Sequence, residues 1–265
     1  MSDQSVISAE YRQLQEAIIK KQNEWKGQLQ EIKVNDHFTS LDKSAPFAYQ
    51  MEWQAETHQL EELLMDFITI LQENRPELRE DLEKLSTHKE AEKWIREALA
   101  LNQFYFEKTA KDLDVPAWLL SFVCEVAARP ILQVIADRFA NHIADMEVHG
   151  GCPCCGEPPR LAEVGKNKKK QLICPRCHTK WEEKKISCAH CGTDNHEHLK
   201  VLKVEGRETE EIHVCEECKG YTKVIQTARM LTKLDPALLD LTTLHLDYIA
   251  QEKGYTQEDV EGSLT

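Results

Sequence analysis

The fold of this 265-residue chain is decided by four short motifs: Cys152-Pro-Cys-Cys155, Cys174-Pro-Arg-Cys177, Cys188-Ala-His-Cys191 and Cys215-Glu-Glu-Cys218. A tetrahedral site for a soft metal ion takes four thiolates. Two residues between cysteines let one turn of backbone direct both sulfurs at one ion. Two such turns complete a site, so the sequence predicts two metal ions, each iron or zinc in a four-cysteine site.

The simplest pairing of these turns is sequential, the first with the second and the third with the fourth. Eighteen residues separate Cys155 from Cys174, and 23 separate Cys191 from Cys215. Both lengths fit a zinc-ribbon or rubredoxin-like module, in which a β-hairpin links two turns. An interleaved pairing, with the first and third turns sharing an ion, is the less favoured alternative. The predicted ligands are Cys152, Cys155, Cys174, Cys177, Cys188, Cys191, Cys215 and Cys218.

The residues around the turns support this interpretation. Gly156 and Gly192 follow a second cysteine directly, where a left-handed residue lets backbone N–H groups point at sulfur. Trp181 and Tyr221 follow later and are expected to cover the sulfurs. Because such modules have little apolar core, the bound metal should supply folding energy directly.

Several other cysteine, histidine and lysine residues are interpreted as not binding metal. Cys154 is predicted to be a thiol that binds no metal. The alternative hypothesis is a redox role or a role as an alternate metal ligand. His178 and His190 adjoin ligand positions, but the cysteines already complete both predicted sites. The lysine run Lys166–Lys170 is predicted to be a solvated hairpin tip, since it has no interleaved aromatic residues. Cys124 lies in an apolar segment and is predicted to be core.

Residues 1–148 are predicted to form a helical domain. Gly27 is the only glycine before Gly150, and apolar residues recur at three- and four-residue spacing. Thr87 to Glu90 resembles a capping box, and Pro130 is expected to kink or split its helix. The expected helices span residues 8–33, 55–73, 76–85, 88–102 and 116–146.

Strand-like runs replace this pattern after Gly151. They are predicted at 172–173, 181–186, 199–204 and 211–214, and Asp235-Pro236 should cap and begin a last helix that ends near Gly254. The predicted fold class is α+β, with two tandem rubredoxin-like modules after the helical domain. The expected division is 1–148 for the helical domain, 149–183 and 184–228 for the two four-cysteine modules, and 229–265 for the C-terminal helix and tail.

Charge and composition favour some classes of partner and of protein over others. The formal net charge is −13, which suits a protein partner with a basic segment better than a nucleic acid. The chain start has no basic and apolar export signal, and residues 118–135 contain too many polar groups for a membrane span. We therefore expect a cytoplasmic protein with no membrane insertion. In that reducing compartment, Cys-x-x-Cys pairs indicate metal binding or transient redox chemistry more often than a structural disulfide. No phosphate-binding glycine loop or nucleophile motif is present, so no enzymatic activity is predicted.

The order of these features resembles the FdhE family, the formate dehydrogenase accessory proteins. The resemblance is most specific between residues 150 and 255, and Ala128-Arg129-Pro130 is also similar. Its closing part comprises Asp235-Pro236, Asp240-Leu241-Thr242-Thr243-Leu244, Leu246-Asp247 and Gly254-Tyr255.

The resemblance implies a cytoplasmic factor that binds the catalytic subunit of a respiratory formate dehydrogenase before twin-arginine export. It also implies iron bound by the paired cysteines. Cys154 and His178 depart from the family pattern, which bears on redox behaviour and metal choice. Two alternatives are a rubredoxin-like or thiol redox protein and, less favoured, a nucleic-acid-binding zinc ribbon.

Overall fold

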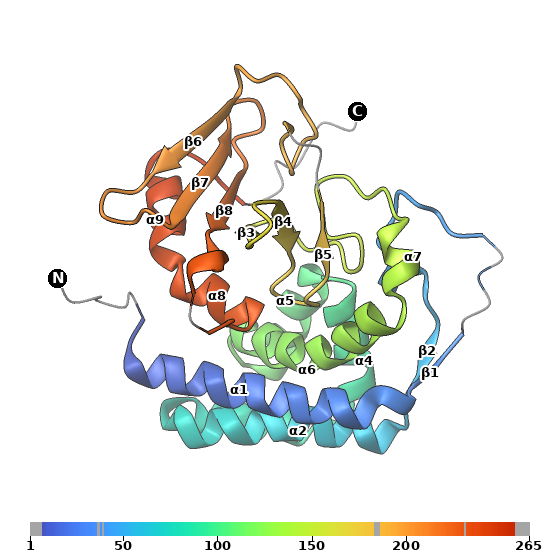
Figure 1. The fold of residues 1–265 in the computed structure, drawn as a ribbon. Helices are drawn as coiled ribbons and strands as arrows, with labels where there is room; N and C mark the ends of the chain where they lie inside the picture. The colour runs from blue at the N-terminus through green and yellow to red at the C-terminus, as the bar shows by residue number, and fades with distance from the viewer. Residues whose placement is uncertain (1–6, 36–37, 39, 183–185, 231, 258–265) are drawn as a thin grey trace. The chain divides into compact units, whose positions relative to one another are not determined.

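The computed structural model describes residues 7–35, 38, 40–182, 186–230 and 232–257 (Figure 1). The chain divides into two compact units. The helical unit contains residues 8–41 and 48–139, and the sheet unit contains residues 1–7, 42–47 and 140–265.

The helical unit is built around one apolar helix, α6 (Ala117–Arg138), which contacts α1, α2, α4 and α5. Helix α6 is long and apolar enough to cross a membrane by length and composition, but most of it is buried within the protein. Cys124 on this helix is fully buried, as expected for core. The surrounding helices are α1 (Ala9–Gln28), α2 (Thr57–Asn74), α3 (Arg79–Ser86), α4 (Ala91–Leu99) and α5 (Gln103–Leu113). The short elements between residues 29 and 78 are η1 (Leu29–Glu31), β1 (Lys33–Val34), η2 (Phe47–Gln50), β2 (Trp53–Gln54) and η3 (Pro76–Leu78).

Helix α6 continues through Pro130, so a split at the proline is ruled out, and the alternative of a kink stays a prediction. Proline has no N–H, which leaves the carbonyl four residues earlier without its helical donor. That carbonyl belongs to Val126, and the buried side chain of Gln22 in α1 donates to it at 2.9 Å. A neighbouring helix therefore supplies the hydrogen bond that the proline removes.

The Gln22→Met substitution is expected to destabilise the helical unit by about 1–3 kcal/mol, because the Val126 carbonyl becomes buried without a donor. Methionine keeps the size of the side chain, so the loss is mainly that of the hydrogen bond. Urea unfolding followed by tryptophan fluorescence measures the change. Gln13→Met, at an exposed position of the same helix, is the control and should change stability by less than about 0.5 kcal/mol. Equal effects of the two substitutions would contradict this account.

Three other details of the helical unit differ from the predictions. Thr87 does not cap α4; its hydroxyl donates back to the Lys84 carbonyl, and Glu90 is the N-terminal cap residue. Helix α5 was not predicted, although Asn102 caps it by accepting from the Tyr105 N–H at 3.1 Å. The helix expected at 8–33 ends as an α-helix at Gln28 and continues as a short 3-10 turn.

The sheet unit contains one six-stranded sheet in the order β5-β4-β3-β8-β7-β6. Neighbouring strands are antiparallel except β3 and β8, which are parallel and pair Leu161 with Lys223. This parallel pair joins the strands that accompany the first two Cys-x-x-Cys turns to those that accompany the last two. The strands are β3 (Leu161–Val164), β4 (Lys170–Ile173), β5 (Lys180–Trp181), β6 (Leu199–Lys203), β7 (Glu210–Cys215) and β8 (Tyr221–Ile225).

Helices α8 (Pro236–Thr242) and α9 (Leu244–Glu252) belong to the same core cluster as one face of this sheet. Asp235 caps α8, as predicted, by accepting from the Ala237 N–H at 2.9 Å. The prediction of a single helix in this region is wrong, because the helix breaks at Thr243. The Thr243 hydroxyl donates to the Leu239 carbonyl. The remaining elements are α7 (Ala140–Ala144) and η4 (Thr227–Arg229).

The α+β fold class is confirmed by the helical unit, the mixed sheet with its cysteine turns and the C-terminal helices. Strands β3 and β8 were not predicted. Residues 183–185 of the strand expected at 181–186 lie outside the described residues, and β5 ends at Trp181. The four-part division at residues 148, 183 and 228 stays a prediction.

Candidate metal centres

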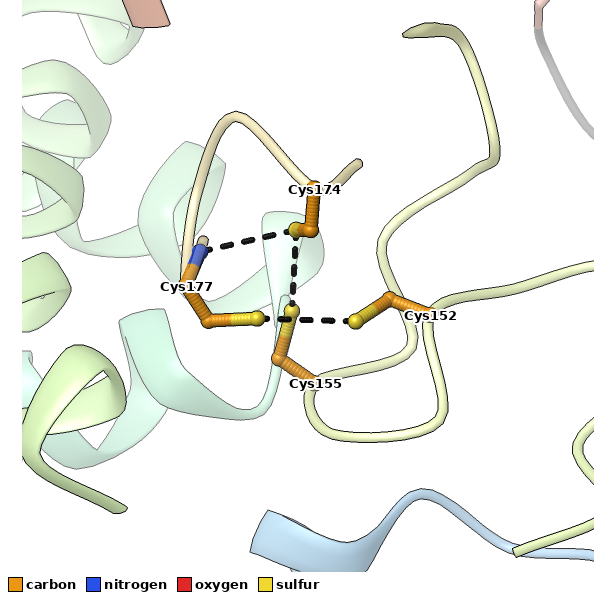
Figure 2. A group of neighbouring side chains, drawn as sticks. All are labelled: Cys152, Cys155, Cys174 and Cys177. Atoms are coloured by element: carbon orange, nitrogen blue, oxygen red, sulfur yellow. Dashed lines mark hydrogen bonds between the residues drawn. The ribbon is translucent and has the colours of Figure 1, made fainter. Parts of the chain in front are cut away.

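The first centre brings together Cys152, Cys155, Cys174 and Cys177 (Figure 2). Cys152 Sγ lies 3.5 Å from Cys177 Sγ, and Cys155 Sγ lies 3.6 Å from Cys174 Sγ. Four sulfurs at about 2.3 Å from a central zinc ion would be about 3.8 Å apart. A disulfide would require about 2.0 Å. The sulfurs therefore have the spacing of a tetrahedral metal site, and all four residues are buried.

The second centre repeats this arrangement with Cys188, Cys191, Cys215 and Cys218. The distance is 3.7 Å between the Sγ atoms of Cys188 and Cys218, and 3.8 Å between those of Cys191 and Cys215. All four cysteines are unbridged. The structure thus groups the turns sequentially, as the spacing predicted, and each group could hold one metal ion.

Each turn is closed in the same way by its backbone. The residue after the second cysteine has a positive φ in all four turns: 74° at Gly156, 67° at His178, 76° at Gly192 and 60° at Lys219. In the first three turns, its N–H donates to the carbonyl of the first cysteine. Backbone N–H groups also approach sulfur; the Cys177 N–H lies 3.5 Å from Cys174 Sγ. Glycine is the easier residue at this φ, but histidine adopts it more often than most residues, so His178 fills the place without changing the turn.

Cys154 is a fifth thiol beside the first centre. Its side chain is fully buried, and it is not part of the group of four. Contact with Cys177 and burial raise the pKa of Cys154 well above its ordinary value, which keeps it a neutral thiol. Burial raises the pKa of Cys177, but contacts with Cys152, Cys154 and Cys155 outweigh this and lower it to about 6. The Thr179 hydroxyl lies 3.1 Å from Cys177 Sγ, so two neutral groups can hydrogen-bond to this thiolate.

The two histidines lie beside the cysteine turns and outside both groups of four. His178 Nε2 lies 3.5 Å from Asp235 Oδ1. His190 Nε2 lies 2.9 Å from the Tyr221 carbonyl oxygen, which fixes a proton on that nitrogen. His190 therefore connects the third turn to β8.

Gly150 permits a close backbone approach between the start of the first centre and the third turn. A Cβ atom at Gly150 would lie 2.6 Å from the His190 carbonyl oxygen, and the residue has φ +71°.

Gly150→Ala is expected to displace the third cysteine turn, and to destabilise the sheet unit by more than the roughly 1–3 kcal/mol of backbone strain alone. Thermal unfolding of the metal-loaded protein measures it. Gly206→Ala is the control, since Gly206 has φ +76° with open space around it; equal losses would contradict a role for the close contact.

A buried ionic cluster links the sheet to α8 and α9, and the sequence patterns did not reveal it. Lys223 on β8 is 1% exposed, and its Nζ lies 2.7 Å from both Asp240 Oδ1 and Asp247 Oδ2. The ammonium also donates to the Asp240 carbonyl at 2.9 Å. Arg160 Nε lies 3.0 Å from Asp240 Oδ2, and the Tyr221 hydroxyl donates to Asp247 at 2.9 Å.

The charges in this cluster shift one another's pKa values. Burial raises the pKa of Asp240, but Arg160 and Lys223 outweigh it and hold that pKa below the ordinary range. Burial dominates at Asp247 and raises its pKa, against the opposing effect of Lys223. Asp240 and Asp247 belong to the segment on which the family resemblance rests, so the resemblance pointed to these residues without giving their role.

The two aromatic residues expected to cover the sulfurs, Trp181 and Tyr221, both take part in packing or bonding of the sheet. Trp181 packs against the small cluster of Ala162, Leu172 and Val224, and Tyr221 bonds to Asp247 on α9. The expectation that they cover the sulfurs stays a prediction. The lysine run forms the β3–β4 connection, as predicted, with Lys168 at φ +59°.

Comparisons with known proteins agree with this geometry. A family model described as "FdhE, C-terminal domain" matches residues 186–264. An FdhE homologue from Shewanella baltica (strain OS223) is 29% identical over 108 residues, which is 39% of this chain and 35% of that protein. One from Rhizobium meliloti is 26% identical over 152 residues, 54% of this chain and 48% of that protein. Residues 186–264 therefore match the FdhE C-terminal domain, and the chain is similar to FdhE homologues in sequence.

The fold of this chain also matches that of a solved FdhE protein along nearly its whole length. The crystal structure of the FdhE protein from Pseudomonas aeruginosa superposes with a TM-score of 0.58 and 20% identity. The superposition covers 94% of this chain and 95% of that chain. The sequence matches, by contrast, span only about a third to a half of the curated relatives.

Proposed function

We propose that this protein is a non-enzymatic accessory factor for the maturation of a respiratory formate dehydrogenase. In this proposal it binds the catalytic subunit in the cytoplasm before export and holds two metal ions, one in each four-cysteine centre. The observation that carries the proposal is the joining of two tetrahedral cysteine groups to the FdhE C-terminal helices through one continuous sheet. The net charge of −13 favours a partner with a basic segment.

The eight cysteines fit a thiophilic divalent ion. Both groups offer four sulfurs at tetrahedral spacing, a donor set that accepts zinc or iron. Such an ion would fix the four turns and thereby the ends of β4, β7 and β8. It would supply folding energy to a unit that also relies on the buried ionic cluster around Lys223.

A binding experiment with the full chain tests the proposed function. The metal-loaded protein should retain the formate dehydrogenase catalytic subunit in a pull-down, and the same protein stripped of metal should retain much less. A strain that lacks the protein should lose formate dehydrogenase activity, and the wild-type gene should restore it. Absence of binding, together with normal activity in the deletion strain, would refute the proposal.

A rubredoxin-like redox carrier is the second candidate, because one centre is open to solvent. Cys191 is exposed and Cys218 is partly exposed, and an exposed iron–thiolate site can exchange electrons with a partner. Iron in such a site gives a coloured protein whose visible absorption changes on reduction. A colourless, zinc-loaded protein that supports full formate dehydrogenase activity would exclude this candidate.

A further inference from the structure

The two four-cysteine centres differ in their access to solvent. The four cysteines of the first centre are each 0–1% exposed. In the second centre, Cys188 and Cys215 are buried, but Cys191 is exposed and Cys218 is intermediate. Both centres have the same donor set and similar sulfur spacing, so solvent access is the property that separates them.

The surroundings of the centres increase this difference. The first centre is lined by the buried thiol of Cys154 and by the Thr179 hydroxyl, which lies 3.1 Å from Cys177 Sγ. Backbone N–H groups donate to sulfur in both centres, at Cys174 in the first and Cys218 in the second. The buried groups around the first centre additionally limit the access of solvent to it. Beside the second centre, a cavity of about 290 Å³ is lined by Cys188 and Cys215, together with His190 and Val201. A small thiol can therefore reach the second centre from the cavity as well as from the exposed side at Cys191.

We propose that the second centre is a metal-exchange site, whereas the first centre holds its ion as part of the fold. In the exchange step, an external thiolate bonds to the ion and the bond from the ion to Cys191 Sγ breaks, which leaves Cys191 as the free thiolate. No electron is transferred and the charge on the ion does not change. Repetition of the step at Cys218 leaves the ion held by two protein sulfurs, from which the external thiol can remove it. This inference rests on the metal binding in the proposed function, but not on the identity of the client.

The two centres should release metal by different routes. At the second centre an incoming ligand bonds before the protein opens, so the rate should rise with thiol concentration. At the first centre the sulfurs become reachable only after local unfolding of the turns and strands that cover them. Its release rate should therefore be set by that opening and be independent of thiol concentration.

Kinetics of zinc release test the proposal on the full-length protein loaded with two zinc ions. Dithiothreitol is the competing thiolate, and a chromogenic zinc chelator records the released ion. We expect two phases of equal amplitude, the faster by at least about tenfold, because only the slow one requires local opening. Only the fast rate should increase with dithiothreitol. A single phase, or two phases with the same thiol dependence, would overturn the proposal.

Two further measurements assign the phases. Cys191→Ser should bind one zinc ion and show only the slow phase, whereas Cys155→Ser should keep the fast one. Because either variant could fail to fold, alkylation of the zinc-loaded wild-type protein gives an independent assignment. Mass spectrometry should find Cys191 and then Cys218 modified as one zinc ion is lost, with Cys152, Cys155, Cys174 and Cys177 protected. Equal labelling of the two groups would overturn the proposal. A failed pull-down would refute binding of the formate dehydrogenase catalytic subunit, but it would not change the expected zinc-release and alkylation results.

Discussion

Removal of both metal ions is expected to unfold the sheet unit while α1 to α6 remain folded. The strands are short, and two of the connections that order them are the cysteine turns themselves. A structural zinc site in a small module contributes roughly 10–16 kcal/mol of apparent binding free energy at neutral pH. One such site is therefore comparable in size to the roughly 5–15 kcal/mol of net stability of a typical domain.

Hydrogen exchange on the stripped and reloaded protein measures this effect. Amides in β3, β4, β7 and β8 should lose protection without metal and regain it on addition of zinc, while those of α6 should change little. Cys155→Ser and Cys215→Ser should each lose one ion. Cys124→Ala, outside both groups, should retain two, as should Cys154→Ala. Full protection of the strands in metal-free protein would contradict a structural role for the ions.

Lys223→Met is expected to destabilise the sheet unit by about 3–5 kcal/mol, the range for breaking a buried ion pair from one side. Three oxygens of Asp240 and Asp247 lie within 2.9 Å of the ammonium nitrogen. Methionine fills a similar volume but leaves the buried Asp247 carboxylate with the Tyr221 hydroxyl and the Gln257 amide as its side-chain donors within the described part of the chain. Thermal unfolding of the zinc-loaded protein measures the loss.

Lys200→Met is the matched control for this substitution. Lys200 on β6 also forms an ion pair, at 2.9 Å to Glu216, but its side chain is 56% exposed. Exposed pairs contribute about 0–1 kcal/mol, so the control should lie within that range. A double substitution of Lys223→Met with Asp247→Leu should recover part of the lost stability, since it removes the unpaired carboxylate. Similar losses for Lys223→Met and Lys200→Met would show that the buried cluster is unimportant.

The cysteine centres could be predicted from the sequence because their geometry is local. Each Cys-x-x-Cys turn directs two sulfurs by itself, and the hairpin-sized spacers indicate which turns share an ion. The positive φ after each second cysteine was foreseeable at Gly156 and Gly192. At His178 and Lys219 it was not, because these residues carry no comparable signal.

The missed features depend on residues far apart in the chain. Strand β8 is buried along its length, but a lysine in its sequence does not indicate a buried strand. Lys223 is buried because its partners lie on α8 and α9, far away in the sequence. Strand β3 is only four residues long, and no local sequence pattern indicates that it pairs in parallel with β8. The continuity of α6 through Pro130 depends on Gln22, 104 residues away from the Val126 carbonyl that it bonds.

Metal analysis combined with X-ray absorption spectroscopy tests directly whether each group of four cysteines binds one metal ion. For protein purified without oxygen, we expect two iron or zinc ions per chain, each with four sulfur neighbours at about 2.3 Å. Fewer than two ions, a first shell containing nitrogen or oxygen, or disulfide bonds among the eight cysteines would contradict this expectation.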